Sequence, residues 1–108
     1  MKVQVKISLV TDQNEEKHPI GFGRGIVELL ERVQNSGSIN KAAHEMGMAY
    51  SKAWKILNQT EQEFDCRLLQ RNGYHGSQLT PQAVELIAQY RRALNAARSA
   101  AQAAADQA

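Results

Sequence analysis

Three short helical segments separated by two glycines are the feature that most constrains the fold of this chain. Apolar residues recur at helical spacing over residues 24–35, 38–46 and 50–65, with Gly37 and Gly47 between the segments. Because glycine adopts left-handed backbone conformations without steric cost, it ends one helix and lets the chain turn sharply into the next. The pattern predicts three helices packed together through tight turns, the second of them barely two turns long.

The second and third of these segments have the spacing of a helix-turn-helix. Ala43, four residues before Gly47, lets the two helices cross closely. In such a motif the start of the second helix enters the DNA major groove, where lysine reaches guanine or phosphate and serine donates or accepts a hydrogen bond. That start comprises Ala49, Tyr50, Ser51 and Lys52, with Lys55 one turn further on. A plain α-hairpin in a helical core has the same spacing, and the pattern alone leaves both interpretations open.

The segment at residues 50–65 is strongly amphipathic. Its inner stripe is expected to comprise Tyr50, Ala53, Trp54, Leu57, Glu61 and Phe64, and its outer face Lys52, Lys55, Gln59 and Gln62. The place of Trp54 on the apolar stripe favours packing in the core over stacking on a base. Glu61, Glu63 and Asp65 would repel phosphate, so we expect the end of this helix to point away from a polyanion.

Strands are predicted on both sides of the helices. Residues 2–10 alternate apolar and polar side chains, which indicates a half-buried strand, whereas residues 11–23 are expected to be a loop. Strand-like pieces at 68–70 and 78–79 enclose Asn72, Gly73 and Gly76, the chemistry of a tight hairpin. A hairpin directly after a helix-turn-helix forms the wing of a winged helix. Its Arg71 and His75 would then reach the neighbouring backbone or minor groove, unless the hairpin is only structural.

A long helix is predicted from Thr80 and Pro81 onward, since threonine is a favoured N-cap and proline a favoured first helical residue. Its apolar face is expected to comprise Ala83, Ile87, Tyr90, Leu94, Ala97 and Ala101. Nine of the last 16 residues are alanine. Such a tail buries little by itself, so it either frays or packs against another subunit.

Charge and cysteine content narrow the function classes. The formal net charge is +2, but residues 66–100 carry five arginines against Glu85 alone, which suggests a polyanionic partner or a solvated face. The single Cys66 excludes a disulfide framework and fits a reducing cytoplasm.

The histidines are too widely spaced for a metal site, and no catalytic set is evident, so neither metal, cofactor nor enzyme activity is expected. No signal peptide or membrane-length apolar run is present, so no membrane association is expected.

Several of these residues also form a sequence pattern that resembles that of a known family. The run Gly37-Ser38-Ile39, Ala42-Ala43, Gly47-Met48, Tyr50 and Ala53-Trp54, the stretch GFGRGIVELL and the sequence Leu79-Thr80-Pro81 carry the likeness. Over about residues 1–95 the chain resembles the LysR-type winged helix-turn-helix, and most closely the DNA-binding domain of ModE-family molybdate-responsive regulators. The resemblance departs from the family in the shortened wing, NGYHGS, and in Ala49, where the family commonly has serine. The oxyanion-binding domain of those regulators has no counterpart here, so molybdate binding is not expected.

Together, these patterns predict a mostly helical α+β fold, a winged helix-turn-helix with a leading strand. One domain would span residues 1–108, with strand, helix-turn-helix and wing in 1–80 and a long, dimerising helix in 81–108. The predicted function is a cytoplasmic, homodimeric, sequence-specific transcriptional regulator that binds double-stranded DNA, with bases contacted through Tyr50, Ser51, Lys52 and Lys55. Phosphate contacts are expected from Arg24, Ser38, Asn40, Lys41, Arg71 and His75. The alternative is a winged-helix protein-interaction module that has lost DNA binding.

Overall fold

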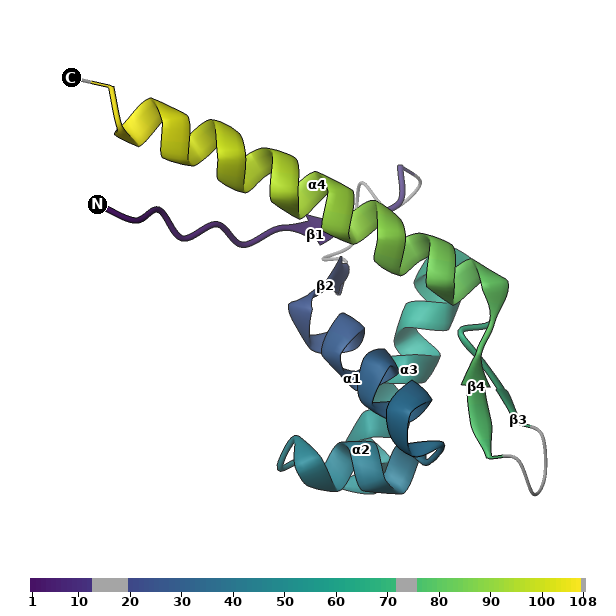
Figure 1. Cartoon of the computed structure of the whole chain (residues 1–108). Helices are drawn as coiled ribbons and strands as arrows, with labels where there is room; N and C mark the ends of the chain where they lie inside the picture. Colours follow the sequence, from purple (N-terminus) through teal and green to yellow (C-terminus); the bar gives the residue numbers. More distant parts are fainter. Residues whose placement is uncertain (13–19, 72–75, 108) are drawn as a thin grey trace.

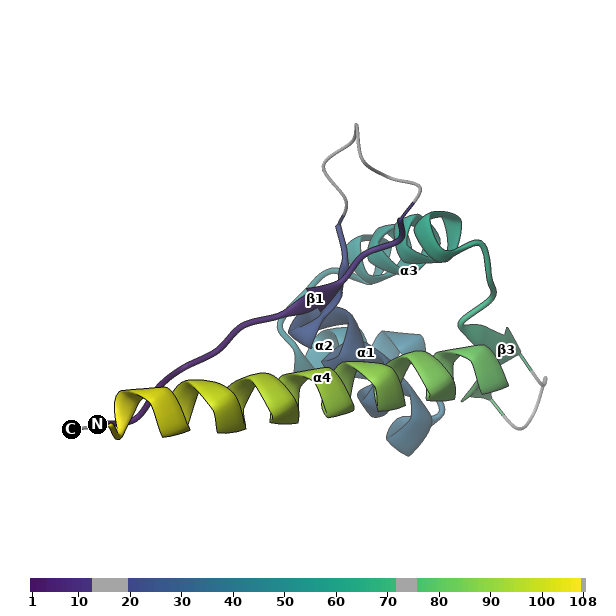
Figure 2. The same cartoon turned by 90° about the horizontal axis from the view of Figure 1, so that it is seen from above.

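The computed structural model describes residues 1–12, 20–71 and 76–107 (Figure 1). In chain order the elements are β1 (Ser8–Leu9), β2 (Phe22–Gly23), α1 (Arg24–Ser36), α2 (Ile39–Glu45), α3 (Tyr50–Phe64), β3 (Leu69–Arg71), β4 (Ser77–Leu79) and α4 (Pro81–Ala105). Helices α1 to α3 form a bundle, α4 crosses one end of it, and the β3–β4 hairpin lies beside it (Figures 1 and 2). The predicted α+β, mostly helical winged-helix architecture is confirmed.

The helix boundaries follow the local signals in the sequence. Gly37 is left-handed (φ 73°), and its N–H donates to the Val33 carbonyl at 2.7 Å, which ends α1. The Ser38 Oγ accepts the Lys41 N–H at 3.1 Å and caps α2. Gly47, also left-handed (φ 68°), makes the turn into α3. Both glycine stops were predicted, because each glycine acts on its own turn of chain.

Helix α1 is central to the core. Its Leu29, Leu30 and Val33 are fully buried and belong to one cluster with Phe22, Leu57 and Leu68. Trp54 is half-buried against this cluster, as its position on the apolar stripe predicted. Tyr50 departs from its predicted place on the inner stripe, since its side chain is 46% exposed. The first turn of α3 leaves its ring at the surface, where its main aromatic contact is the edge of Trp54.

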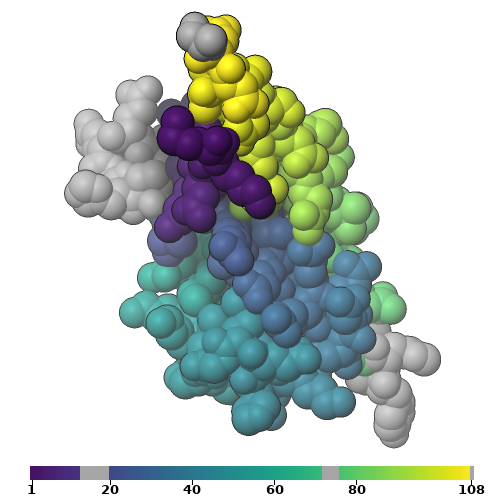
Figure 3. Space-filling model, turned by 60° about the vertical axis from the view of Figure 1, so that its left-hand side comes forward, coloured from purple at the N-terminus to yellow at the C-terminus, as the bar shows by residue number. Residues whose placement is uncertain are grey.

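The N-terminal segment differs from the predicted strand of residues 2–10. Only Ser8–Leu9 forms a ladder, antiparallel to Phe22–Gly23, which the sequence had suggested to be loop. Residues 1–7 instead run along the last turns of α4 (Figures 1 and 3). There the Val3 N–H donates to Gln102 Oε1 at 3.0 Å, and Gln102 Nε2 donates to the Met1 carbonyl at 2.8 Å. The predicted alternation of exposed and partly buried side chains is present in this segment. Its neighbour, however, is helix α4, where a strand was expected.

The wing and the long helix match their predictions. Strands β3 and β4 pair antiparallel, Leu69 opposite Leu79 and Arg71 opposite Ser77. The predicted turn and His75 lie outside the described residues. Thr80 caps α4 by accepting the Ala83 N–H at 3.1 Å, with Pro81 as the first helical residue. The face predicted for α4 is buried at Ala83, Tyr90 and Leu94, and the helix then projects past the bundle (Figure 2).

Candidate nucleic-acid interface

The outer face of α3 carries two exposed lysines, Lys52 and Lys55. Neither side chain makes a hydrogen bond or ion pair within the described part of the chain. Gln59 and Gln62 continue the same exposed face, as the amphipathic pattern predicted. Because no described acidic residue pairs with them, both ammonium groups are available to phosphate or to base acceptors.

The start of α3 adds donors to this face. Its N-cap is Ala49, which supplies no side-chain hydrogen bond, and the first turn holds no acidic residue. The first amides of a helix lack intrahelical partners and carry the positive end of the helix dipole. The exposed Tyr50 and Ser51 lie on this turn. The tip of α3 is therefore positive and rich in hydrogen-bond donors.

Helix α2 packs against α3 and places its own start at the same end of the molecule, the end farthest from α4 (Figure 1). Asn40 and Lys41 are exposed there, with no side-chain partner among the described residues. Ser38 is different, because its hydroxyl is engaged in capping α2 and its N–H donates to Ser36 Oγ at 3.2 Å. The role of Ser38 that the structure shows is to hold the start of α2 in place.

The last residue of strand β3, next to the turn of the wing, is tied to α3 by an aromatic contact. The Arg71 Cζ lies 4.5 Å from the centroid of the Trp54 ring, a cation–π geometry. The Trp54 ring in turn meets the Tyr50 ring edge-on, with centroids 6.2 Å apart. Arg71 is therefore held close to the first turns of α3. The sequence had placed Arg71 in the wing but had not connected it with Trp54.

A close backbone contact also fixes the wing against the turn between α1 and α2. The Ser77 N–H donates to the Gly37 carbonyl at 3.0 Å. A Cβ added at Gly76 would lie 2.4 Å from that same carbonyl oxygen, closer than atoms can approach. Gly76 is also left-handed (φ 73°). The sequence marked Gly76 as a hairpin residue, and its fit against Gly37 emerges only when α1 and β4 pack together.

Arg24 stands apart from the other predicted contact residues. It is the first residue of α1 and lines a groove against α4. The 13 residues of α1 span about 20 Å, so Arg24 lies at the opposite end of the helix from the α1–α2 turn. The structure gathers the other described candidates at one end of the molecule: Ser38, Asn40, Lys41, Ala49, Tyr50, Ser51, Lys52, Lys55 and Arg71.

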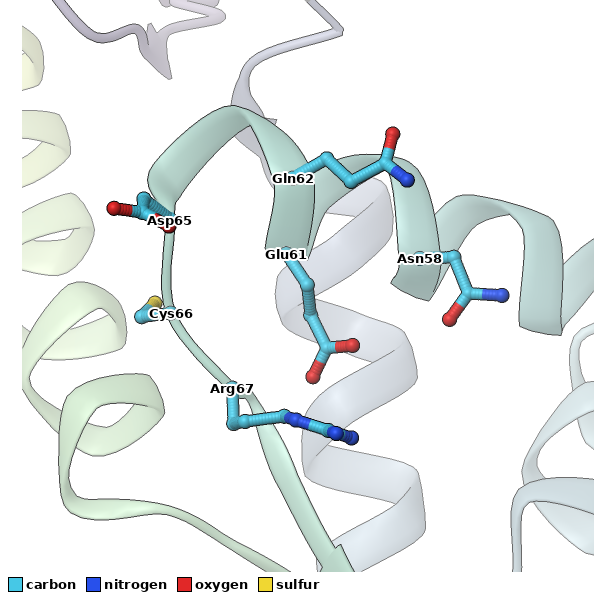
Figure 4. A pocket seen from close by; sticks show the side chains of 6 residues that line it. All are labelled: Asn58, Glu61, Gln62, Asp65, Cys66 and Arg67. Atoms are coloured by element: carbon cyan, nitrogen blue, oxygen red, sulfur yellow. The ribbon is translucent and has the colours of Figure 1, made fainter.

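The acidic residues at the end of α3 have structural roles that the sequence did not reveal. Glu61 accepts the Leu68 N–H at 2.7 Å, and Glu63 accepts the Gly21 N–H at 3.0 Å. Both carboxylates therefore anchor neighbouring chain segments, at the end of α3 away from Lys52, where acidic residues were expected. Figure 4 shows Glu61 and Arg67 extending into a shared hollow beside Cys66. Burial raises the pKa of the Cys66 thiol, and the Glu61 and Asp65 carboxylates raise it further.

A helix-turn-helix followed by a two-stranded wing, with a lysine-bearing third helix, defines the winged-helix class of DNA-binding domains. The chain belongs to the bacterial regulatory helix-turn-helix proteins of the lysR family, whose model matches residues 26–84. This family consists of regulators and not of enzymes, in agreement with the sequence prediction. Within the described residues, none of the helices has the length and apolar character needed to cross a membrane.

Individual relatives agree with this assignment. The chain is 37% identical over 67 residues to the molybdenum transport protein ModE of Herbaspirillum seropedicae, which aligns 58% of this chain with 25% of that protein. The chain thus matches about a quarter of that relative's length. The predicted likeness to LysR-type and ModE-family domains is confirmed.

Two solved structures show the fold. CbnR, a LysR family transcriptional regulator, matches with a TM-score of 0.56 and 22% identity, over 73% of this chain and 27% of that one. A complex of the CbnR DNA-binding domain with DNA matches with a TM-score of 0.56 and 21% identity, over 73% and 91% of the two chains.

Proposed function

We propose that this chain is a sequence-specific, DNA-binding transcriptional regulator of the cytoplasm, with α3 in the major groove. The observation that carries the proposal is the outer face of α3, where Lys52 and Lys55, unpaired among the described residues, follow a helix start without a side-chain cap. The solved complex of the similar CbnR domain contains DNA, which supports the same class of partner here. A major groove about 12 Å wide admits one helix with its side chains.

The contacts divide by location. Tyr50, Ser51, Lys52 and Lys55 would face base edges, and the small Ala49 would let the helix start approach the DNA closely. Asn40 and Lys41, beside the Ser38 cap, would bind phosphates on one side of the groove. The wing, with Arg71 and His75, would reach the backbone or minor groove on the other side. Phosphate contacts set the register on the duplex, and the α3 contacts select its sequence.

We further propose that the whole of residues 1–108 acts as one unit and forms a homodimer through residues 81–108. Helix α4 has 25 residues, a length of about 38 Å, and it extends well past the bundle (Figure 1). The exposed Ala96, Ala100 and Ala104 on its last turns offer a flat, closely approachable face. Two recognition helices about 34 Å apart would contact successive major grooves of a pseudo-palindrome.

The test is fluorescence anisotropy with duplexes from the DNA upstream of the chain's own gene, across a series of salt concentrations. The double variant Lys52→Ala/Lys55→Ala should lose at least about tenfold in affinity, and its log–log salt slope should fall by about 2. Arg67→Ala is the matched control, because Arg67 is exposed at the far end of α3 and has no ion pair with any residue that the structure describes. It should bind like the wild type.

Analytical ultracentrifugation of the same samples tests the homodimer. A folded dimer that binds no duplex even at low salt would overturn the DNA proposal and favour the protein-interaction module. Equal losses in the double variant and in Arg67→Ala would show that binding follows net charge and not the face of α3.

A further inference from the structure

A groove between the start of α1 and the middle of α4 lies outside the proposed DNA interface. Its volume is about 410 Å³, and Val27 and Leu94 form its apolar part. The α1 side of the groove begins at Arg24, which the structure separates from the other predicted DNA contacts. Figure 2 shows α4 passing over α1 at this position.

The charges that line this groove leave two arginines without partners. Glu31 accepts hydrogen bonds from Arg91 Nη2 at 2.5 and 2.6 Å, so these two charges neutralise each other. Glu28 is bound to Arg32 at 3.1 Å. By contrast, Arg24 and Arg98 line the groove, and their side chains make no ion pair or hydrogen bond with any described residue.

The helix start beside Arg24 adds to this positive field. Helix α1 has no side-chain cap, and its first turn contains no acidic residue. The positive end of its dipole is therefore uncompensated at the same place as the Arg24 charge. Negative charge from a ligand would be stabilised there by both.

The hydroxyl of Tyr90 is a further indication, independent of charge, that this groove binds a ligand. It lines the groove and is only 4% exposed, yet its hydroxyl has no hydrogen-bond partner among the described residues. Buried tyrosine hydroxyls ordinarily find a partner. Every fully enclosed side-chain nitrogen or oxygen in the described part of the chain has a partner, so the Tyr90 hydroxyl retains some contact with solvent, and Tyr90 lines this groove. Since none of the described residues accepts its hydrogen bond, that bond is available to a ligand.

We propose that this groove binds a small oxyanion with phosphate or carboxylate chemistry. Arg24 and Arg98 would donate charge-assisted hydrogen bonds, and the Tyr90 hydroxyl would donate a third to the same anion. Arginine suits this role because its planar fork matches two oxygens of such a ligand. Since Arg24 belongs to α1 and Arg98 to α4, a bound anion would join the helix-turn-helix to the long helix.

The experiment is an NMR titration of the ¹⁵N-labelled full chain, without DNA, with inorganic phosphate at constant ionic strength held by chloride. Saturable shifts at the Arg24 and Arg98 Nε–H groups and at the Tyr90 amide are expected at phosphate concentrations below about 10 mM. Separate titrations with sulfate and acetate distinguish a tetrahedral anion from a carboxylate.

Three substitutions in the groove test whether the named side chains bind the anion. Arg98→Gln and Arg24→Gln should each abolish saturation, and Tyr90→Phe, which removes one hydroxyl, should weaken binding about 3- to 10-fold. Arg92→Gln is the matched control, because Arg92 lies on α4 outside the groove and pairs with Glu85. It should bind phosphate like the wild type. Linear shifts in the wild type, or equal losses in Arg92→Gln and Arg98→Gln, would overturn the proposal. Because no DNA is present, this outcome is independent of the DNA titration.

Discussion

The basic residues of α4 and those of α3 differ in whether they form ion pairs. On α4 two of the three arginines form ion pairs, Arg91 with Glu31 and Arg92 with Glu85, and only Arg98 has no acidic partner among the described residues. On α3 the exposed Lys52 and Lys55 have no acidic partner among the described residues. The sequence showed the richest basic stretch in residues 66–100, yet only Arg71 of its five arginines belongs to the proposed interface, and Lys52 and Lys55 lie before it. A count of charges along the chain therefore does not locate a polyanion site, because ion pairs with Glu31 and Glu85 remove part of that charge.

The largest effect should come from breaking the fit between the wing and the α1–α2 turn. Gly76→Ala places a Cβ against the Gly37 carbonyl and requires a left-handed alanine, so the wing must shift. We expect a loss of about 1–3 kcal/mol in unfolding free energy and a drop of DNA affinity of about tenfold. Urea denaturation and fluorescence anisotropy measure the two effects.

Gly25→Ala is the matched control for that substitution. A Cβ at Gly25 meets no atom within 4 Å, and Gly25 lies inside α1. Alanine should therefore stabilise the helix by about 0.5–1 kcal/mol and leave DNA affinity unchanged. If Gly76→Ala behaved like Gly25→Ala, the wing would not depend on the Gly37 contact.

A smaller effect is expected where the wing meets α3. Arg71→Ala removes the cation over Trp54 together with a positive charge at the interface, and DNA affinity should fall about 3- to 10-fold. Because Trp54 is the single tryptophan of the chain, its fluorescence reports the contact directly.

Arg71→Lys separates the two contributions. Lysine keeps the charge but loses the planar guanidinium, so the fluorescence of Trp54 should change while most of the affinity is retained. An unchanged spectrum in Arg71→Ala would contradict the contact between the wing and α3.

The smallest effect should come from a paired arginine on α4. Arg91→Ala breaks its ion pair with Glu31, and both side chains are about half exposed, 51% and 42%. Exposed pairs contribute at most about 1 kcal/mol, so thermal unfolding should change little. DNA affinity should stay within about twofold of the wild type, in contrast to Lys52→Ala/Lys55→Ala. A loss as large as that of Lys52→Ala/Lys55→Ala would show that a paired arginine of α4 matters for DNA binding as much as the lysines of α3.

Most helices of the fold were predictable because their signals are local. Gly37, Ser38 and Thr80 act on hydrogen bonds within one turn of the chain, so residue identity is enough to place the boundaries of α1, α2 and α4. The outward face of α3 was likewise evident from spacing, since a 3.6-residue period separates Lys52 and Lys55 from Ala53 and Leu57.

Strand β2 could not be predicted, because it exists only through its partner. Phe22–Gly23 pairs with Ser8–Leu9, and a Cβ at Gly21 would lie 2.8 Å from Ser8 Oγ. The glycines around Phe22 looked like loop residues in the sequence. In the structure, Gly21 lets two backbones approach closely, which is a property of the pair and not of either segment.

Spacing and capping were enough to predict the helices, because periodicity and capping depend on near neighbours, and the resemblance to LysR-type domains turned that pattern into a predicted winged helix-turn-helix. Long-range packing settled the rest: Arg24 lies in a groove with Tyr90, Glu61 and Glu63 hold distant backbone amides, and Gly76 abuts Gly37. These contacts join residues between 7 and 66 positions apart, and local propensity carries no information about such distances.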